Sequence, residues 1–326
     1  MHPNHFLSTH KSDIYKTIGV AIIAFLALTI RMHYITEPEA ILQFDYLEEN
    51  ADIEHFANPE VENILAQILA ILDEELPPST VSEDSSPPIS SQKTSIFDAL
   101  CSSDKALCQK VSFNGTFSDK ELYAYFKQFQ FLVDEIDISA KRGDEVRIVL
   151  KNFILNQTKG SRRGSAGRDK LTINLGGIMY DNEYFQVLTH EMGHIVDLGS
   201  LQGKSKTKNA NFTEFDKIVF AVDDPSLEYY KYSRQSETIR KSWVTRQDFC
   251  SGYGMSNPFE DFSECFNLYL NHQNIFRFLA RTNEVLKNKY NYLANLYGGN
   301  FLSNSTMSLA TINADWRAWD TTRIEE

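Results

Sequence analysis

Residues 182–198 read NEYFQVLTHEMGHIVDL, and they decide how the rest of the chain is interpreted. Apolar residues recur in this stretch at intervals of three and four, which predicts an amphipathic helix. Asp181 or Asn182 is placed to cap its beginning, and Gly199 is placed to end it. Such a helix buries one side, so chemistry carried on that side lies at the edge of the domain core.

The segment HEMGH, residues 190–194, carries metal-binding chemistry on this helix. His190 and His194 are four residues apart and therefore face a common point. Glu191 lies about 100° round the helix and can reach a water molecule on a metal held there. This is the HExxH arrangement, in which two histidines bind Zn²⁺ and the glutamate is the general base. Gly193 costs roughly 1 kcal/mol in a helix interior, which predicts a close-packed neighbour.

A catalytic zinc also needs a third protein ligand and one open position. The pattern HExxHxxGxxH fails here, because Asp197 and Ser200 stand where Gly and His are required. The clearest carboxylates lie in NPFEDFSECFNLYL, residues 257–270, where Glu260 and Glu264 are one turn apart at the start of a predicted helix. One of them can ligate the metal, and the other can accept the ring N–H of a ligating histidine.

Two segments, HEMGHIVD over 190–197 and YGMSNPFEDFSECF over 253–266, resemble the catalytic domain of anthrax toxin lethal factor and its relatives. Those relatives include secreted clostridial Pro-Pro endopeptidases. The resemblance implies a zincin-like fold, a Zn²⁺ cofactor and the hydrolysis of peptide bonds. It implies, position by position, the zinc ligands His190, His194 and Glu260.

The resemblance also implies roles around the metal. Glu191 is then the general base, and Tyr253 steadies the oxyanion. Glu264 supports a ligating histidine, and we assign Asp197, the last residue of the first segment, to a similar supporting role. The gap between the two segments is longer than is usual in this group, which predicts an inserted loop around residues 203–210.

The remaining pattern predicts an α+β domain. Ser118 and Glu121 form a capping box for a helix that ends near Ile136. The β-branched run VRIVL, residues 146–150, and the alternating run LTINL, residues 171–175, predict strands of a small mixed sheet. The second strand either pairs with an extended substrate or is plain sheet structure.

The C-terminal part is predicted to be mainly helical. Helical periodicity returns over residues 226–246 and 260–281. The expected architecture is therefore a small sheet with the active-site helix, followed by a helical region.

Residues 17–30, TIGVAIIAFLALTI, are nearly all apolar and uncharged. As a helix they span only ~21 Å, short of a ~30 Å hydrocarbon core. They are either a cleaved signal peptide or an uncleaved anchor lengthened by snorkelling of Lys16 and Arg31. The absence of a small-x-small cleavage site after Ile30 favours the anchor. Both readings export the rest of the chain, because the positive flank stays inside.

Composition sets the domain organisation and the partners. We expect an export signal or anchor over 1–35, a helical stalk over 36–76, a disordered Pro/Ser-rich linker over 77–95 and the peptidase domain over 96–326. A net charge of −12 argues against nucleic acid as a partner. The expected partners are a protein or peptide substrate and, through the N-terminal apolar segment, a membrane.

The four cysteines leave two alternatives open. Cys101 with Cys108 and Cys250 with Cys265 can form two local disulfides in an exported chain, or all four can be buried thiols. Two functional alternatives also stand beside the peptidase. One is a catalytically inactive zincin-fold surface binding module, which could dispense with Glu191. The other is a structural zinc protein, which favours four Cys or His ligands that this chain does not offer.

Overall fold

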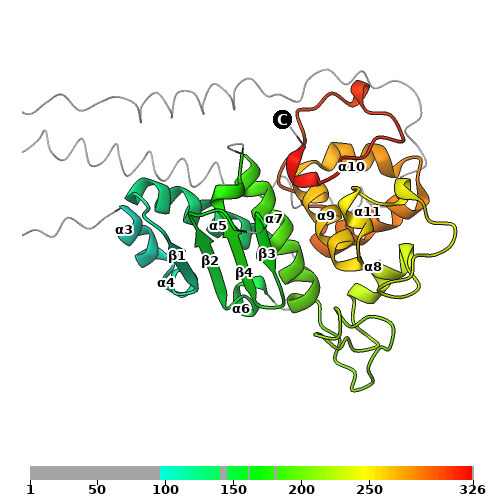
Figure 1. Ribbon diagram of the computed structural model, residues 1–326, viewed down its shortest axis with the longest axis horizontal. Coiled ribbons are helices and arrows are strands. Elements are labelled where there is room, and N and C mark those ends of the chain that lie inside the picture. Colours follow the sequence, from blue (N-terminus) through cyan, green and yellow to red (C-terminus); the bar gives the residue numbers. More distant parts are fainter. Residues whose placement is uncertain (1–95, 140–144, 161, 180–181, 325–326) are drawn as a thin grey trace, which may run out of the picture. The chain divides into compact units, whose positions relative to one another are not determined.

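The computed structural model describes residues 96–139, 145–160, 162–179 and 182–324 (Figure 1). The predicted segments over 1–35, 36–76 and 77–95 lie outside these residues. Within the described residues, no helix combines the length and the apolar composition that a bilayer crossing requires.

A four-stranded mixed sheet forms the first half of the domain. The strands are β1 (Val111–Asn114), β2 (Asn152–Asn156), β3 (Gly164–Ala166) and β4 (Lys170–Asn174), in the order β1-β2-β4-β3. β1, β2 and β4 are parallel, whereas β3 pairs antiparallel with β4. Alternate residues of β2 and β4 are buried, as the period of two requires. The predicted α+β class with a small mixed sheet is confirmed.

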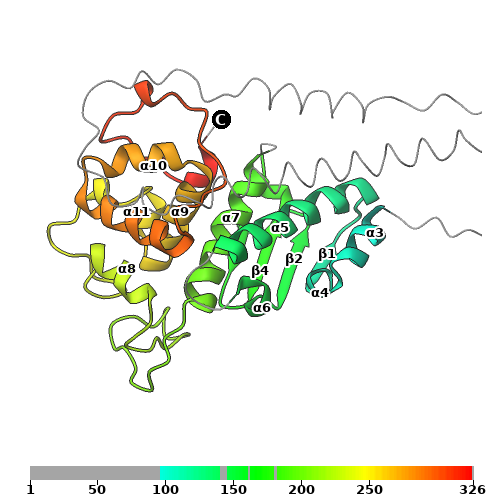
Figure 2. The same ribbon diagram turned by 180° about the vertical axis from the view of Figure 1, so that it is seen from behind.

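Two long helices complete this half. α5 (Asp119–Ser139) crosses one face of the sheet (Figure 2), where its Phe129 packs against Phe153 of β2 with ring centroids 4.5 Å apart. The predicted capping box is present, since the Ser118 amide donates to the Glu121 carboxylate at 2.8 Å. α7 (Glu183–Ile195) continues as a π-helical turn, η3 (Val196–Ser200), so the predicted helix is confirmed to within one residue of its end.

The second half is helical, with α8 (Ser226–Ser233), α9 (Pro258–Asn271), α10 (Gln273–Ala280) and α11 (Glu284–Tyr297). α9 packs against α7 with close backbone approach at Gly193 (Figure 1). A Cβ on Gly193 would lie 3.0 Å from the Cα of Ser263, so the predicted close-packed neighbour is α9.

Three element predictions need correction. VRIVL is not a strand: Val146–Val149 is a short helix, α6, because the Asp137 carboxylate accepts hydrogen bonds from the amides of Val146 (2.6 Å) and Arg147 (3.1 Å). The strand is the following segment, β2. The predicted 226–246 helix ends at Ser233, where Arg234 turns extended and its guanidinium donates to the Met255 carbonyl.

The predicted 260–281 helix is two helices that meet at His272. That residue has φ −137° and ψ 46°, and its buried ring contacts the side-chain oxygen of Gln186 at 3.0 Å. The long-range contact therefore breaks a periodicity that is continuous in the sequence.

Both possible local disulfides are formed. Cys101–Cys108 joins α3 (Ile96–Ser103) to α4 (Lys105–Cys108), and Cys250–Cys265 joins the segment before α9 to α9 itself. The described cysteines are therefore paired, not free.

Candidate metal centre

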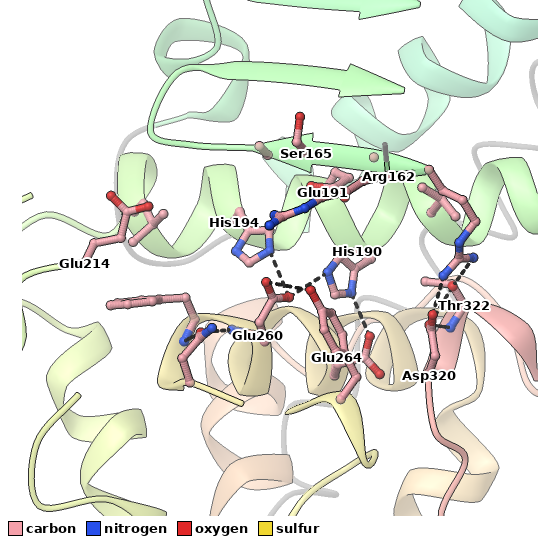
Figure 3. A pocket seen from close by; sticks show the side chains of 18 of the residues that line it. Arg162, Ser165, His190, Glu191, His194, Glu214, Glu260, Glu264, Asp320 and Thr322 are labelled. Carbon is pink, nitrogen blue, oxygen red and sulfur yellow. Dashed lines mark hydrogen bonds and ion pairs between the residues drawn. The ribbon is translucent and has the colours of Figure 1, made fainter. Parts of the chain in front are cut away.

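Three side chains converge between the neighbouring helices α7 and α9 (Figure 3). Nε2 of His190 lies 3.2 Å from Oε2 of Glu260, and Nε2 of His194 lies 3.4 Å from the same oxygen. The three donor atoms lie within 4.8 Å of one another. The structure therefore brings together the residues that the sequence proposed as ligands.

This donor set fits zinc. Tetrahedral Zn²⁺ holds nitrogen and oxygen ligands at about 2.0–2.1 Å, which places neighbouring ligand atoms roughly 3.3 Å apart. The observed separations of 3.2 and 3.4 Å match that spacing. Two imidazoles and one carboxylate also leave a fourth position open, as a catalytic site requires.

Local sequence explains why Glu260 reaches the histidines. The side chain of Asn257 caps α9 by accepting from the amides of Phe259 (3.0 Å) and Glu260 (2.8 Å), with Pro258 at the first helical position. Glu260 is thereby fixed in the first turn. The small residue Gly193 lets that turn approach α7.

Glu264 lies one turn beyond Glu260 and is fully buried. Its Oε1 is 2.9 Å from Nδ1 of His190, and its Oε2 accepts a hydrogen bond from the Thr321 amide at 2.8 Å. Glu264 is therefore placed to orient the ring of His190, as the resemblance implied. Sequence reasoning missed Thr321, which belongs to the C-terminal turn η7 (Thr321–Arg323) and is 57 residues away along the chain.

Buried charges balance one another in this cluster. Burial alone would lower the pKa of His190, but the carboxylates of Glu260 and Glu264 raise it well above its ordinary value. Burial opposes ionisation of Glu260 as well, yet the two histidines hold its pKa far below the usual range. The histidines and carboxylates therefore stabilise each other's charged forms in this cluster.

Glu191 is buried and lines the same cavity as the cluster. Burial raises the pKa of its carboxyl group, and the neighbouring histidines oppose that rise. A Cβ on Gly164 would lie 2.4 Å from Oε1 of Glu191, so strand β3 passes directly over the carboxylate. A side chain at position 164 would force the Glu191 carboxylate to move.

Tyr253 lies in a short turn before α9, η5 (Tyr253–Met255). Its hydroxyl donates a hydrogen bond to Oε1 of Glu260 at 3.1 Å, and its ring stacks near that of His190 with centroids 6.2 Å apart. Burial and the charge of Glu260 raise the pKa of the hydroxyl. The residue thus stands at the cluster, as expected.

Asp197 is placed differently from Glu264. It is fully buried, its Oδ2 accepts a hydrogen bond from the Tyr230 hydroxyl at 2.6 Å, and its backbone oxygen accepts one from Ser226 at 3.1 Å. Burial raises its pKa to about 7. Among the described residues, Asp197 makes no hydrogen bond to His194, and only the charges of the two side chains interact. The hydrogen bonds of Asp197 therefore stabilise the fold around η3.

A cavity of about 600 Å³ lies over the cluster and opens to solvent. Its wall on one side is the edge strand β3, and on the other it includes Glu214, Phe215 and Lys217. Residues 214–216 have φ between 45° and 64°, and the Glu237 carboxylate holds this turn by accepting the Phe215 amide at 2.7 Å. This turn lines the cavity, whereas residues 203–210 of the predicted insertion do not.

Of the two roles considered for the strand at residues 171–175, pairing with an extended substrate is wrong, and the strand is plain sheet structure. β4 is hydrogen-bonded to β2 on one side and to β3 on the other, so it has no free edge. The short strand β3 occupies the edge and faces the cavity (Figure 3). Its sequence GSA carries no apolar alternation, so the pattern did not predict a strand there.

Comparison with protein-family models, with curated proteins and with solved structures finds no match to this chain.

Proposed function

We propose that this chain is an exported zinc-dependent endopeptidase of zincin-like fold. The observation that carries the proposal is the convergence of His190, His194 and Glu260 beside Glu191, at the wall of a cavity bordered by an edge strand. Two histidines and a glutamate with one open position are a ligand set of zinc hydrolases.

Zinc bound to this set would lower the pKa of a water molecule to about 7 and polarise a substrate carbonyl. Glu264 fixes the ring of His190, which directs the other ring nitrogen toward the ligand cluster. Glu191 accepts the proton of the attacking water on its carboxylate and passes it to the leaving amine. Burial raises the pKa of this carboxyl group, which favours its taking the proton.

Substrate alignment is assigned to β3. Its outer edge can pair with an extended peptide, since β4 occupies only its inner edge. Gly164 then brings the peptide backbone next to Glu191, because the strand and the carboxylate are in close contact. The tyrosine hydroxyl of Tyr253 stands where it can move from Glu260 to the oxygen that gains charge during attack.

A peptide-library cleavage profile tests this function. The full-length chain, purified in detergent and loaded with zinc, is expected to cut a defined subset of peptides. Cleavage should stop when a chelator removes the metal and return when zinc is restored. A zinc-binding chain that cuts no peptide or protein would instead be an inactive surface binding module.

A further inference from the structure

The positive charges that line the cavity differ in how they are used. Nη1 of Arg163 contacts Glu183 at 2.6 Å and the Thr322 hydroxyl at 2.7 Å, and its other nitrogen contacts Asp320. Lys217 lies on the opposite wall near Glu214, and no ion pair joins it to the described residues. Arg163 is therefore committed to groups of the protein itself.

Arg162 lies on the β3 side of the cavity and is not committed in this way. It lines the cavity, and within the described part of the chain its guanidinium has no ion-pair partner. Its backbone is fixed, since its carbonyl accepts a hydrogen bond from Nδ2 of Asn174 at 2.6 Å. Its side chain lines the cavity together with the ligand cluster (Figure 3).

An exposed indole stands at the same cavity. Trp319 is 70% exposed, yet its position is fixed by its backbone. Its carbonyl accepts the Tyr253 amide at 2.7 Å, the neighbouring Ala318 carbonyl accepts the Gly252 amide at 2.9 Å, and the ring lies against Gly252. An anchored, exposed aromatic ring provides a surface for the apolar stem of a bound side chain.

Strand direction assigns these two groups to one half of a substrate. A peptide that pairs antiparallel with β3 runs opposite to it, so residues after the scissile bond approach the beginning of the strand. Gly164 marks the scissile position beside Glu191. Arg162 lies two residues earlier, in the bend that precedes the strand and at most about 7 Å away along the chain. It therefore faces roughly the second residue after the cleaved bond.

We propose that Arg162 and Trp319 form a subsite for a substrate carboxylate that follows the scissile bond. The carboxylate is either an acidic side chain or the C-terminus of a short peptide. This inference rests on the proposed function, which supplies the peptide-binding edge and the cleavage point. The guanidinium binds the carboxylate through paired N–H donors, and the indole covers the aliphatic stem.

The test uses acetylated alanine octapeptide amides in which one Glu is moved through the sequence. Matching Gln peptides and a peptide with a free C-terminal carboxylate accompany them. Binding is measured by calorimetry on the full-length, zinc-loaded chain carrying Glu191→Gln, so that binding is observed without turnover. Cleavage by the parent chain locates the Glu relative to the cut bond.

The preferred Glu peptide, or the free-carboxylate peptide, should bind about fivefold more tightly than its neutral counterpart. The preference should disappear in Arg162→Gln and should fall with rising salt. It should persist in Arg168→Gln, which removes an exposed arginine of the turn between β3 and β4 that does not line the cavity. A Glu preference places the carboxylate on a side chain, and a free-terminus preference places it at the chain end.

Two results would overturn the inference in distinguishable ways. If peptides bind but Glu and Gln are equivalent, or the preference survives Arg162→Gln, the subsite is wrong while the proposed function stands. If none of the peptides binds, the peptide-binding cleft itself is refuted, and the subsite falls with it.

Discussion

Gly193→Ala tests whether the contact between α7 and α9 sets the spacing of the metal donors. The added methyl carbon would lie 3.0 Å from Cα of Ser263, 3.1 Å from its Oγ and 3.2 Å from a ring carbon of Phe266. Ordinary carbon contacts are about 3.5–4.0 Å. Because Ser263 and Phe266 are fully buried, α9 must move by a few tenths of an ångström.

Two opposing effects of the added methyl group set the expected free energy of unfolding of Gly193→Ala. Alanine is favoured over glycine in a helix interior by about 1 kcal/mol. Overpacking a close contact costs about 1–3 kcal/mol. In the absence of zinc, the free energy of unfolding of Gly193→Ala should therefore equal that of the parent or fall below it by up to about 2 kcal/mol.

Zinc affinity should change more than stability. α9 carries Glu260 and the supporting Glu264, so its displacement moves both carboxylates away from His190. Disturbing the groups around a metal site typically lowers affinity 10–100-fold, and we expect a loss of at least tenfold for Gly193→Ala.

The assay is a zinc competition titration against a chromophoric chelator, beside urea unfolding in the presence of excess chelator. Gly167→Ala is the matched control, since a Cβ there would have no neighbour within 4 Å. If Gly193→Ala is stabilised by about 1 kcal/mol and binds zinc within twofold of the parent, the helix contact does not control the donor spacing.

Four further substitutions separate the roles around the site. Glu260→Gln should abolish tight zinc binding, whereas Glu264→Gln should lower affinity only about 10–100-fold; the reverse order in a competition titration would exchange their roles. Tyr253→Phe should retain zinc and lower kcat at least tenfold, because an oxyanion donor typically contributes about 10²–10³; a kcat within about twofold of the parent would assign Tyr253 to packing. The pKa of Asp197 is raised to about 7 from an ordinary 3.8, so the folded chain holds a proton that the unfolded chain releases between these values, and stability falls as pH rises through that window. Asp197→Asn should therefore be more stable than the parent at pH 8, by as much as about 4 kcal/mol, and this gain should vanish near pH 4. Its zinc affinity should be unchanged. If urea titrations give equal unfolding free energies for Asp197→Asn and the parent at both pH values, the pKa of Asp197 is not raised by folding.

The parts of the site that sequence could predict are those set by local spacing. His190 and His194 share a helix face because they are four residues apart, and α7 forms where its periodicity predicts it. Glu260 and Glu264 stand out because they lie one turn apart at the start of a predicted helix, and the family resemblance implies which of them is the ligand.

What sequence could not predict depends on contacts between distant segments. The run VRIVL looked like a strand, but the Asp137 carboxylate caps it as a helical turn. The edge strand β3 has three small residues and no alternation, and it is extended only because β4 pairs with it. The Thr321 amide reaches Glu264 through folding of the C-terminal segment, for which the sequence carries no local signal.

The central claim is that His190 holds the metal while Glu191 moves the proton. It is tested most directly by measuring zinc content and peptide cleavage together in the full-length parent, His190→Ala and Glu191→Ala chains. The account predicts that His190→Ala loses both zinc and cleavage, because two ligands hold zinc poorly. It predicts that Glu191→Ala keeps one zinc per chain and loses cleavage, because only the base is removed. Equal loss of zinc in both variants, or undiminished cleavage by Glu191→Ala, would contradict it.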